Sequence, residues 1–118
     1  MAEPEKPSRE TLETIDVDGH RRAVEIDHRA SRFEIVIDDH VAVLPFHVRG
    51  STISLIHTEV PPALRHKGLA DAIAHAALEY ARAHAMVVKP FCPFVAAYLR
   101  RHPEYQVLVD PEFPTATP

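Results

Sequence analysis

The apolar residues of this chain change their spacing once, near residue 68. Before that point, segments rich in Val, Ile and Phe alternate with polar residues, and after it apolar residues recur about every 3.6 positions. Alternation indicates half-buried strands, whereas the longer period indicates a helix with one apolar face. A chain of 118 residues is long enough for one such domain and too short for two. The sequence therefore predicts a single α+β domain whose first strands precede its first helix.

Four strand-like segments precede the change in spacing. They are broken by the turn sequences Asp-Asp-His and Arg-Gly-Ser and cover residues 23–28, 32–39, 40–48 and 51–60. Pro45 has no backbone N–H to donate, so we expect an edge or a bulge within the third segment. Short strands joined by such turns predict an antiparallel meander.

The second half of the chain predicts two helices and two further strands. Six residues share one helical face and predict a helix from about 67 to 83, namely Leu69, Ile73, Ala76, Ala77, Tyr80 and Ala81. A buried strand at 86–92, a helix at 93–102 and a last strand at 105–110 follow. The predicted order is β-β-β-β-α-β-α-β over a domain at 11–110, with flexible tails at 1–10 and 111–118.

Composition argues against several classes of protein. The net charge of −4 disfavours a general nucleic-acid binder, and no apolar run reaches the roughly 20 residues that a membrane-spanning helix needs. The acidic N-terminal sequence has no apolar core for a signal peptide, so a cytoplasmic protein is expected. The single cysteine cannot form an internal disulfide, and the histidines lack the spacing of paired metal ligands, so no metal is predicted.

Gly68 stands between a predicted strand and the long helix. The first turn of a helix presents N–H groups that have no partner within the helix, and a glycine lets a ligand approach the backbone closely. Such a loop can bind a phosphate, and Arg65 and Lys67 flank it. Basic residues cluster at 65–67 and again at 100–102, which suits a small anion; without further evidence, two solvated helix ends explain them better. The glycine spacing is that of neither a Walker loop nor a dinucleotide-binding loop.

The loop resembles one known phosphate-binding sequence. Arg65, Gly68 and Ala70 match the Arg/Gln-x-x-Gly-x-Gly/Ala pyrophosphate loop of the GNAT superfamily of N-acetyltransferases. The surrounding His-Thr-x-Val-Pro, Cys-Pro-Phe-Val and Arg-His-Pro-x-Tyr sequences are similar to those of a compact subgroup of that superfamily, and the resemblance covers residues 32–109. His66 stands where most such proteins have glycine.

The resemblance implies a mixed sheet with an acetyl-CoA or coenzyme A site and an open acceptor side. The implied cofactor-binding residues are His57, Thr58, Val60, Arg65, His66, Lys67, Gly68, Leu69, Ala70, Asp71 and Cys92. The pyrophosphate would lie on the amides around 66–71, and the thioester in a gap between the strands that end near 57–60 and near 92. The acceptor amine is left open among a metabolite, a peptide N-terminus and a protein lysine.

Aminolysis of a thioester needs a base for the amine, a donor to the carbonyl oxygen and a proton for the thiolate. Glu59, or His57 through a water, is a candidate base, and a backbone N–H near Glu59 or Val60 is a candidate donor. The resemblance implies that Tyr98 protonates the sulfur; packing of Tyr98 on the core is the alternative. Cys92, before the helix-starting Pro93, is either a nucleophile or a small buried residue beside the thioester.

Three functions remain open on the sequence. The first is an acetyl-CoA-dependent N-acetyltransferase that acts on a primary amine. The second is a module that binds coenzyme A or acyl-CoA with little or no transferase activity. The third is an interaction domain whose loop is empty.

Overall fold

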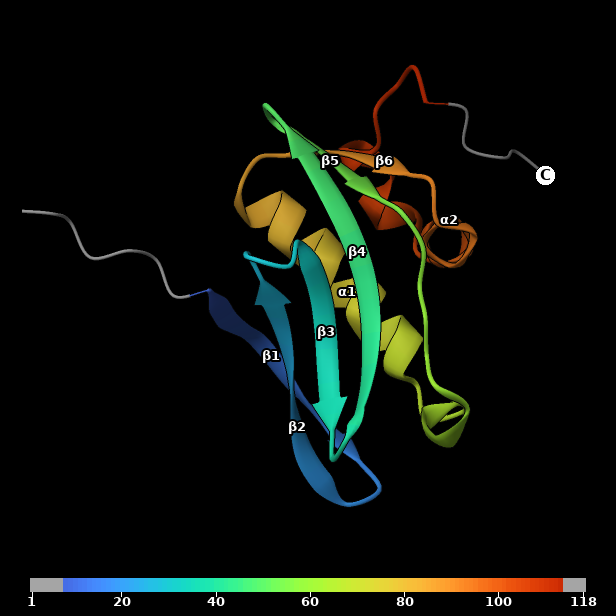
Figure 1. The fold of residues 1–118 in the computed structure, drawn as a ribbon. Helices are drawn as coiled ribbons and strands as arrows, with labels where there is room; N and C mark the ends of the chain where they lie inside the picture. Colours follow the sequence, from blue (N-terminus) through green and yellow to red (C-terminus); the bar gives the residue numbers. More distant parts are fainter. Residues whose placement is uncertain (1–7, 114–118) are drawn as a thin grey trace, which may run out of the picture.

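The computed structural model describes residues 8–113 and shows one mixed sheet flanked by helices (Figure 1). The sheet has six strands in sequential order: β1 (Arg9–Val17), β2 (His20–Asp27), β3 (Arg32–Ile37), β4 (His40–Arg49), β5 (Thr52–Leu55) and β6 (Val87–Pro90). The first five pair antiparallel, whereas β6 pairs parallel with β5. The predicted α+β class with a mixed sheet is confirmed.

The helices follow the meander. The connection from β5 to β6 contains a short 3₁₀ helix and the long helix, and a second α-helix and 3₁₀ helix follow β6: η1 (Pro62–Leu64), α1 (Leu69–Ala83), α2 (Pro93–Arg101) and η2 (Pro103–Leu108). A parallel pair needs such a crossover, because the chain must return to the same end of the sheet. No helix within residues 8–113 is long and apolar enough to span a membrane.

One face of the sheet carries the helices. Figure 1 shows α1 running behind β2, β3 and β4, with no helix of the described residues in front of them. The core lies between α1 and the alternate residues of the strands that face it, including Ile26, Phe33, Ile35, Leu44, Ile53 and Val88. The predicted helical face is buried except for Tyr80, which is only partly buried at its edge.

The sequence analysis missed the first strand. Arg9 and Glu10, assigned to a tail, belong to β1, which pairs with β2 along its whole length. β1 is an edge strand with only Val17 buried, and a register shift between Thr11 and Glu13 interrupts its alternation. A half-exposed edge strand gives a weak apolar pattern, and this is the physical reason for the error. Residues 1–7 and 114–118 of the predicted tails lie outside the described residues.

The predicted last strand at 105–110 is wrong for most of its length. Residues 103–108 form η2, and a single parallel bridge between Val88 and Val109 adds to the edge of β6. Pro103 favours the first turn of a helix, and Val107 is 85% exposed, so the apparent alternation buries almost nothing. Only Tyr105 of η2 is buried. The observed order is therefore β-β-β-β-β-α-β-α.

Pro45 lies in the middle of the sheet and not at its edge. The β3–β4 ladder ends at the pair of Arg32 and Pro45, and the β4–β5 ladder begins with Phe46 and Leu55. The missing N–H of Pro45 thus falls at the junction of two ladders. Its carbonyl still accepts a hydrogen bond from the Ile56 N–H at 3.0 Å.

Candidate functional site

The strands β5 and β6 part after Leu55. The last backbone hydrogen bond between the two segments is the one that the Cys92 N–H donates to the Leu55 carbonyl at 2.9 Å. The chain after β5 instead turns toward β4, where Glu59 and Val43 exchange both backbone hydrogen bonds at 2.9 Å. The predicted strand at 51–60 is therefore regular only as far as Leu55.

A β-bulge separates β5 from this bridge. Phe46 faces Leu55 and Val43 faces Glu59, so three steps along β4 correspond to four steps along its neighbour. Such an extra residue bends a strand and redirects its side chains. Here it opens a gap between the 56–60 segment and the start of α2.

A pocket of about 870 Å³ lies beside this gap. It joins the end of the bulged segment to the loop before α1 and to the inner side of α2, and its lining residues are Val41, Thr58, Glu59, Val60, Pro61, Leu64, Arg65, His66, Gly68, Leu69, Ala70, Asp71, Phe94 and Arg101. The predicted loop residues and the predicted strand-end residues therefore meet at one pocket. Leu64, Phe94 and Arg101 are lining residues that the sequence analysis did not assign to the site.

The loop at 65–68 has a backbone suited to an anion. His66 and Gly68 both adopt left-handed conformations, with φ of 65° and 79°. Within residues 8–113 the N–H groups of Lys67 to Asp71 donate to no protein acceptor, and they stand at the N-terminus of the 15-residue α1. Histidine tolerates the left-handed region better than most residues, which explains how His66 replaces a glycine here. Apart from its two chain neighbours, a Cβ added at Gly68 would meet no atom of the described residues within 4 Å, so the space beside it is open to a ligand.

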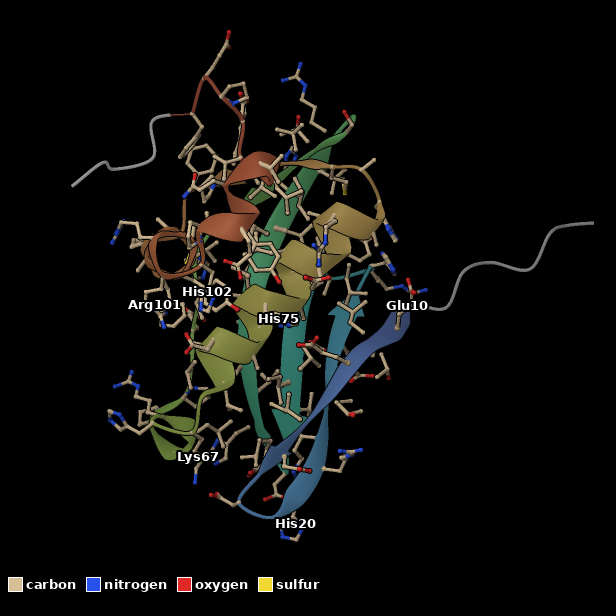
Figure 2. All side chains as sticks on the ribbon, turned by 180° about the vertical axis from the view of Figure 1, so that it is seen from behind. Glu10, His20, Lys67, His75, Arg101 and His102 are labelled. Carbon is tan, nitrogen blue, oxygen red and sulfur yellow. The ribbon has the colours of Figure 1, made fainter. Side chains whose placement is uncertain are left out.

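The two basic side chains of this loop point in different directions. Arg65 lines the pocket, and its Nε donates to the Val60 carbonyl at 3.1 Å. Lys67 does not line it; its Nζ lies 2.5 Å from Asp18 in the β1–β2 turn, beside a second cavity of about 530 Å³. Figure 2 shows Lys67 on the loop close to the β1–β2 turn, and Arg101 farther along the molecule on α2.

Arg101 brings the second basic cluster to the pocket. Its guanidinium forms an ion pair of 3.0 Å with Asp71, in the first turn of α1, and both residues line the pocket. The ion pair raises the pKa of Arg101. The cluster at 100–102 was the available signal for this residue, but only the packing of α2 against α1 selects Arg101 from it.

Cys92 lies at the base of the gap and is buried. It is the N-cap of α2 and Pro93 is its first residue, as predicted. The thiol is 1% exposed and lies 3.2 Å from the Thr58 hydroxyl, and Cys92 does not line the pocket. The Thr58–Cys92 contact therefore joins the two diverging segments just beyond their last backbone link.

Glu59 faces the open side of the sheet. Its partner Val43 alternates with the core residues Ala42 and Leu44, and directly paired residues share a face. The Glu59 side chain is 70% exposed, lines the pocket and lies 3.6 Å from His57, which does not line it. The Glu59 N–H is already bonded to Val43, whereas the Val60 N–H has no protein acceptor within residues 8–113.

The structure does not bring Tyr98 to the pocket. Its ring stacks on His102 with centroids 4.1 Å apart and is 5% exposed, and burial raises the pKa of its hydroxyl. Phe94, one turn earlier on α2, occupies the pocket wall instead. The alternative role of Tyr98, packing on the core, is the one that its surroundings favour.

The sequence model of a family described as GCN5-related N-acetyl-transferase matches residues 32–108, which include the loop, both helices and the bulged segment. This chain belongs to the GCN5-related N-acetyltransferase family.

Two curated vertebrate proteins are similar to this chain. Protein NATD1 of Xenopus tropicalis is 29% identical over 100 residues, covering 82% of this chain and 91% of the relative. Protein NATD1 of Homo sapiens is 31% identical over 88 residues, covering 72% of this chain and 78% of the relative. The resemblance to this family that the sequence motifs indicated is confirmed.

Proposed function

We propose that this protein transfers an acetyl group from acetyl-CoA to a primary amine of a small molecule, peptide or protein. The observation that carries the proposal is one pocket that is lined both by the loop before α1 and by Thr58, Glu59 and Val60, where the chain has left β5. Acetyl-CoA carries an anionic pyrophosphate and, farther along the molecule, a reactive thioester. A pocket with N–H groups and basic side chains on one side, and with Glu59 and the Val60 N–H on another, suits such a ligand.

The loop residues fit the pyrophosphate. The N–H groups of Lys67 to Asp71 have no protein acceptor within the described residues, and the dipole of α1 favours negative charge there. Arg65 and Arg101 add positive charge from the pocket wall. Acetyl-CoA supplies the activated acetyl group, and the residues described here orient it.

Glu59 is the residue that we propose as the base. Glu59 lines the pocket, and its pairing with Val43 puts its side chain on the face of the sheet that carries no helix in the described residues (Figure 1). An amine on that side can pass a proton to Glu59, directly or through His57 at 3.6 Å. The Val60 N–H is the proposed donor to the thioester carbonyl oxygen, since the Glu59 N–H is occupied by Val43.

Direct attack by the amine is the route that we propose, with Cys92 shaping the base of the gap. A thiol that is 1% exposed and hydrogen-bonded to Thr58 has little access to a thioester. Intact-protein mass spectrometry after brief incubation with acetyl-CoA tests this. We expect no acetyl adduct and most activity retained in Cys92→Ala. An adduct that disappears in Cys92→Ala would establish transfer through the thiol.

A second candidate is a coenzyme A-binding module without transferase activity. It is favoured by the position of Tyr98, because no tyrosine lines the pocket within residues 8–113 to protonate the thiolate. Calorimetric titration with coenzyme A and an assay of thiol release with a panel of amines separate the two. Heat of binding with turnover supports the transferase, heat without turnover on any amine supports the module, and no heat rejects both.

A further inference from the structure

Lys67 is held on the side of the loop away from the pocket. Its side chain is only 29% exposed, although it stands in a surface loop between His66 and Gly68. The ammonium contacts Asp18, 49 residues earlier in the chain. Asp18 occupies the turn between β1 and β2, with a φ of 51°.

Within residues 8–113, this contact is the one side-chain hydrogen bond between the loop at 65–68 and the β1–β2 hairpin. Among the described residues, the only other side-chain hydrogen bond from residues 65–68 joins Arg65 to Val60, five positions earlier in the same segment. Arg65 therefore closes the loop on itself, whereas Lys67 fastens it to the β1–β2 hairpin.

The backbone conformation of the loop depends on the contacts that hold it in place. His66 is a non-glycine residue in the left-handed region, and such conformations persist only where the surroundings hold them. The orientation of the unpaired N–H groups at 67–71 depends on this backbone. A loop fixed before binding loses less conformational entropy when the ligand arrives.

We propose that Asp18 and Lys67 are positioning residues that fix the anion-binding loop, and that Lys67 is its anchor and not a ligand of the pyrophosphate. The proposal rests on the proposed function, in that the loop binds the pyrophosphate of coenzyme A. It adds a residue of the β1–β2 turn to the determinants of cofactor affinity. That turn lies outside the region at 32–108 that the family model matches.

The anchor and ligand roles predict opposite effects of one substitution. If Lys67 bound the pyrophosphate, removing its competitor in Asp18→Ala would free the ammonium and tighten coenzyme A binding. If Lys67 is an anchor, Asp18→Ala and Lys67→Ala each loosen the loop and weaken binding. The double variant then loses no more than either single one, because both remove the same contact.

Calorimetric titration with coenzyme A measures this cycle. We expect the dissociation constant to rise about threefold to fivefold in each single variant, the range for a partly exposed ion pair. Asp18→Glu, which keeps the carboxylate, should restore it. The matched control is Asp16→Ala, which removes an exposed ion pair to Arg21 in the same hairpin and should leave affinity unchanged. Unchanged or tighter binding in Asp18→Ala would overturn the proposal.

Hydrogen exchange of the free protein gives a second measurement that needs no ligand. Amides of residues 61–72 should exchange about threefold faster in Asp18→Ala than in Asp16→Ala or the wild type. Equal exchange in all three would reject the anchor even if coenzyme A did not bind. Faster exchange in a protein that shows no heat with coenzyme A would keep the anchor and reject the proposed function.

Discussion

Gly68 meets two separate demands at one position. Its φ of 79° lies in the region where a side chain is disfavoured, and its open side faces the pocket. Apart from the two neighbouring residues, no atom of residues 8–113 lies within 4 Å of an added Cβ, so packing among these residues does not require glycine there. Backbone conformation and the proposed ligand are the two reasons that remain.

The substitution Gly68→Asn separates these reasons. Asparagine enters the left-handed region at modest cost, so the fold should tolerate it, but its side chain would occupy the space proposed for the pyrophosphate. We expect the dissociation constant for coenzyme A to rise by at least about tenfold, with little change in melting temperature. Calorimetry and thermal unfolding measure the two quantities.

Gly50→Asn is the matched control for this change. Gly50 also has a positive φ, 62°, and open space around it, but it lies in the β4–β5 turn and lines no part of the pocket. The affinity of the Gly50→Asn variant for coenzyme A should equal that of the wild type. Equal binding by both variants would mean that nothing approaches Gly68.

At the scale of elements, the ends of α1 and α2 meet through Asp71 and Arg101. An acidic residue in the first turn stabilises α1 through the helix dipole, yet the same carboxylate lines a pocket proposed to hold phosphates. The ion pair with Arg101 at 3.0 Å offsets this negative charge. The two helices therefore contribute charges of opposite sign that offset each other at the pocket.

Substitutions of Arg101 and of Asp71 should change the affinity for coenzyme A in opposite directions. Arg101→Gln leaves the Asp71 carboxylate unpaired in the pocket and should weaken binding about threefold to tenfold. Asp71→Asn removes the repulsion and frees Arg101, so binding should tighten while α1 loses up to about 1 kcal/mol. Calorimetry and thermal unfolding measure both.

Arg100→Gln is the control at the same end of α2. Arg100 is exposed and forms no ion pair within the described residues, so its loss changes the net charge equally without touching the pocket. A loss of affinity in Arg100→Gln as large as that in Arg101→Gln would mean that only overall charge matters.

The elements differ in how far the sequence predicts them. The helix at 69–83 and the helix at 93–101 were expected within two residues, because a strong apolar face and a proline at the first helical position mark them. β1 and η2 were not, because an edge strand and a short 3₁₀ helix bury few side chains. The spacing of apolar residues therefore predicts an element better when that element buries more apolar surface.

At the scale of the whole molecule, stability depends on the single core between α1 and the sheet. Ile53 of β5 is fully buried in it, while its cross-strand partner Val48 is 45% exposed. Ile53→Ala should therefore destabilise the fold by about 2–5 kcal/mol, by lost burial and by a cavity. Val48→Ala should stay within about 0.5 kcal/mol. Chemical denaturation measures both, and similar losses would contradict the conclusion that the core ends before the tip of the β4–β5 hairpin.

Some features of the candidate site depend on neighbouring residues, and others depend on residues that are far apart in the sequence. The loop at 65–71 was predictable, because a glycine between a strand and a helix and its resemblance to a known motif are local features. The direction of Lys67 was not, since it depends on Asp18, and neither was the place of Arg101, since it depends on Asp71. Side-chain partners far apart in sequence leave no periodic signal.

The sequence by itself determined the class of fold, the family and the position of the loop that is proposed to bind an anion, because periodicity, turn residues and a contiguous motif are properties of neighbouring residues. Only the tertiary structure decided that Tyr98 packs away from the pocket, that Cys92 is buried against Thr58, and that Glu59 faces the open side of the sheet. These outcomes depend on a bulge between β5 and β4 and on the packing of α2. Both are set by contacts between segments that approach one another only when the whole chain has folded.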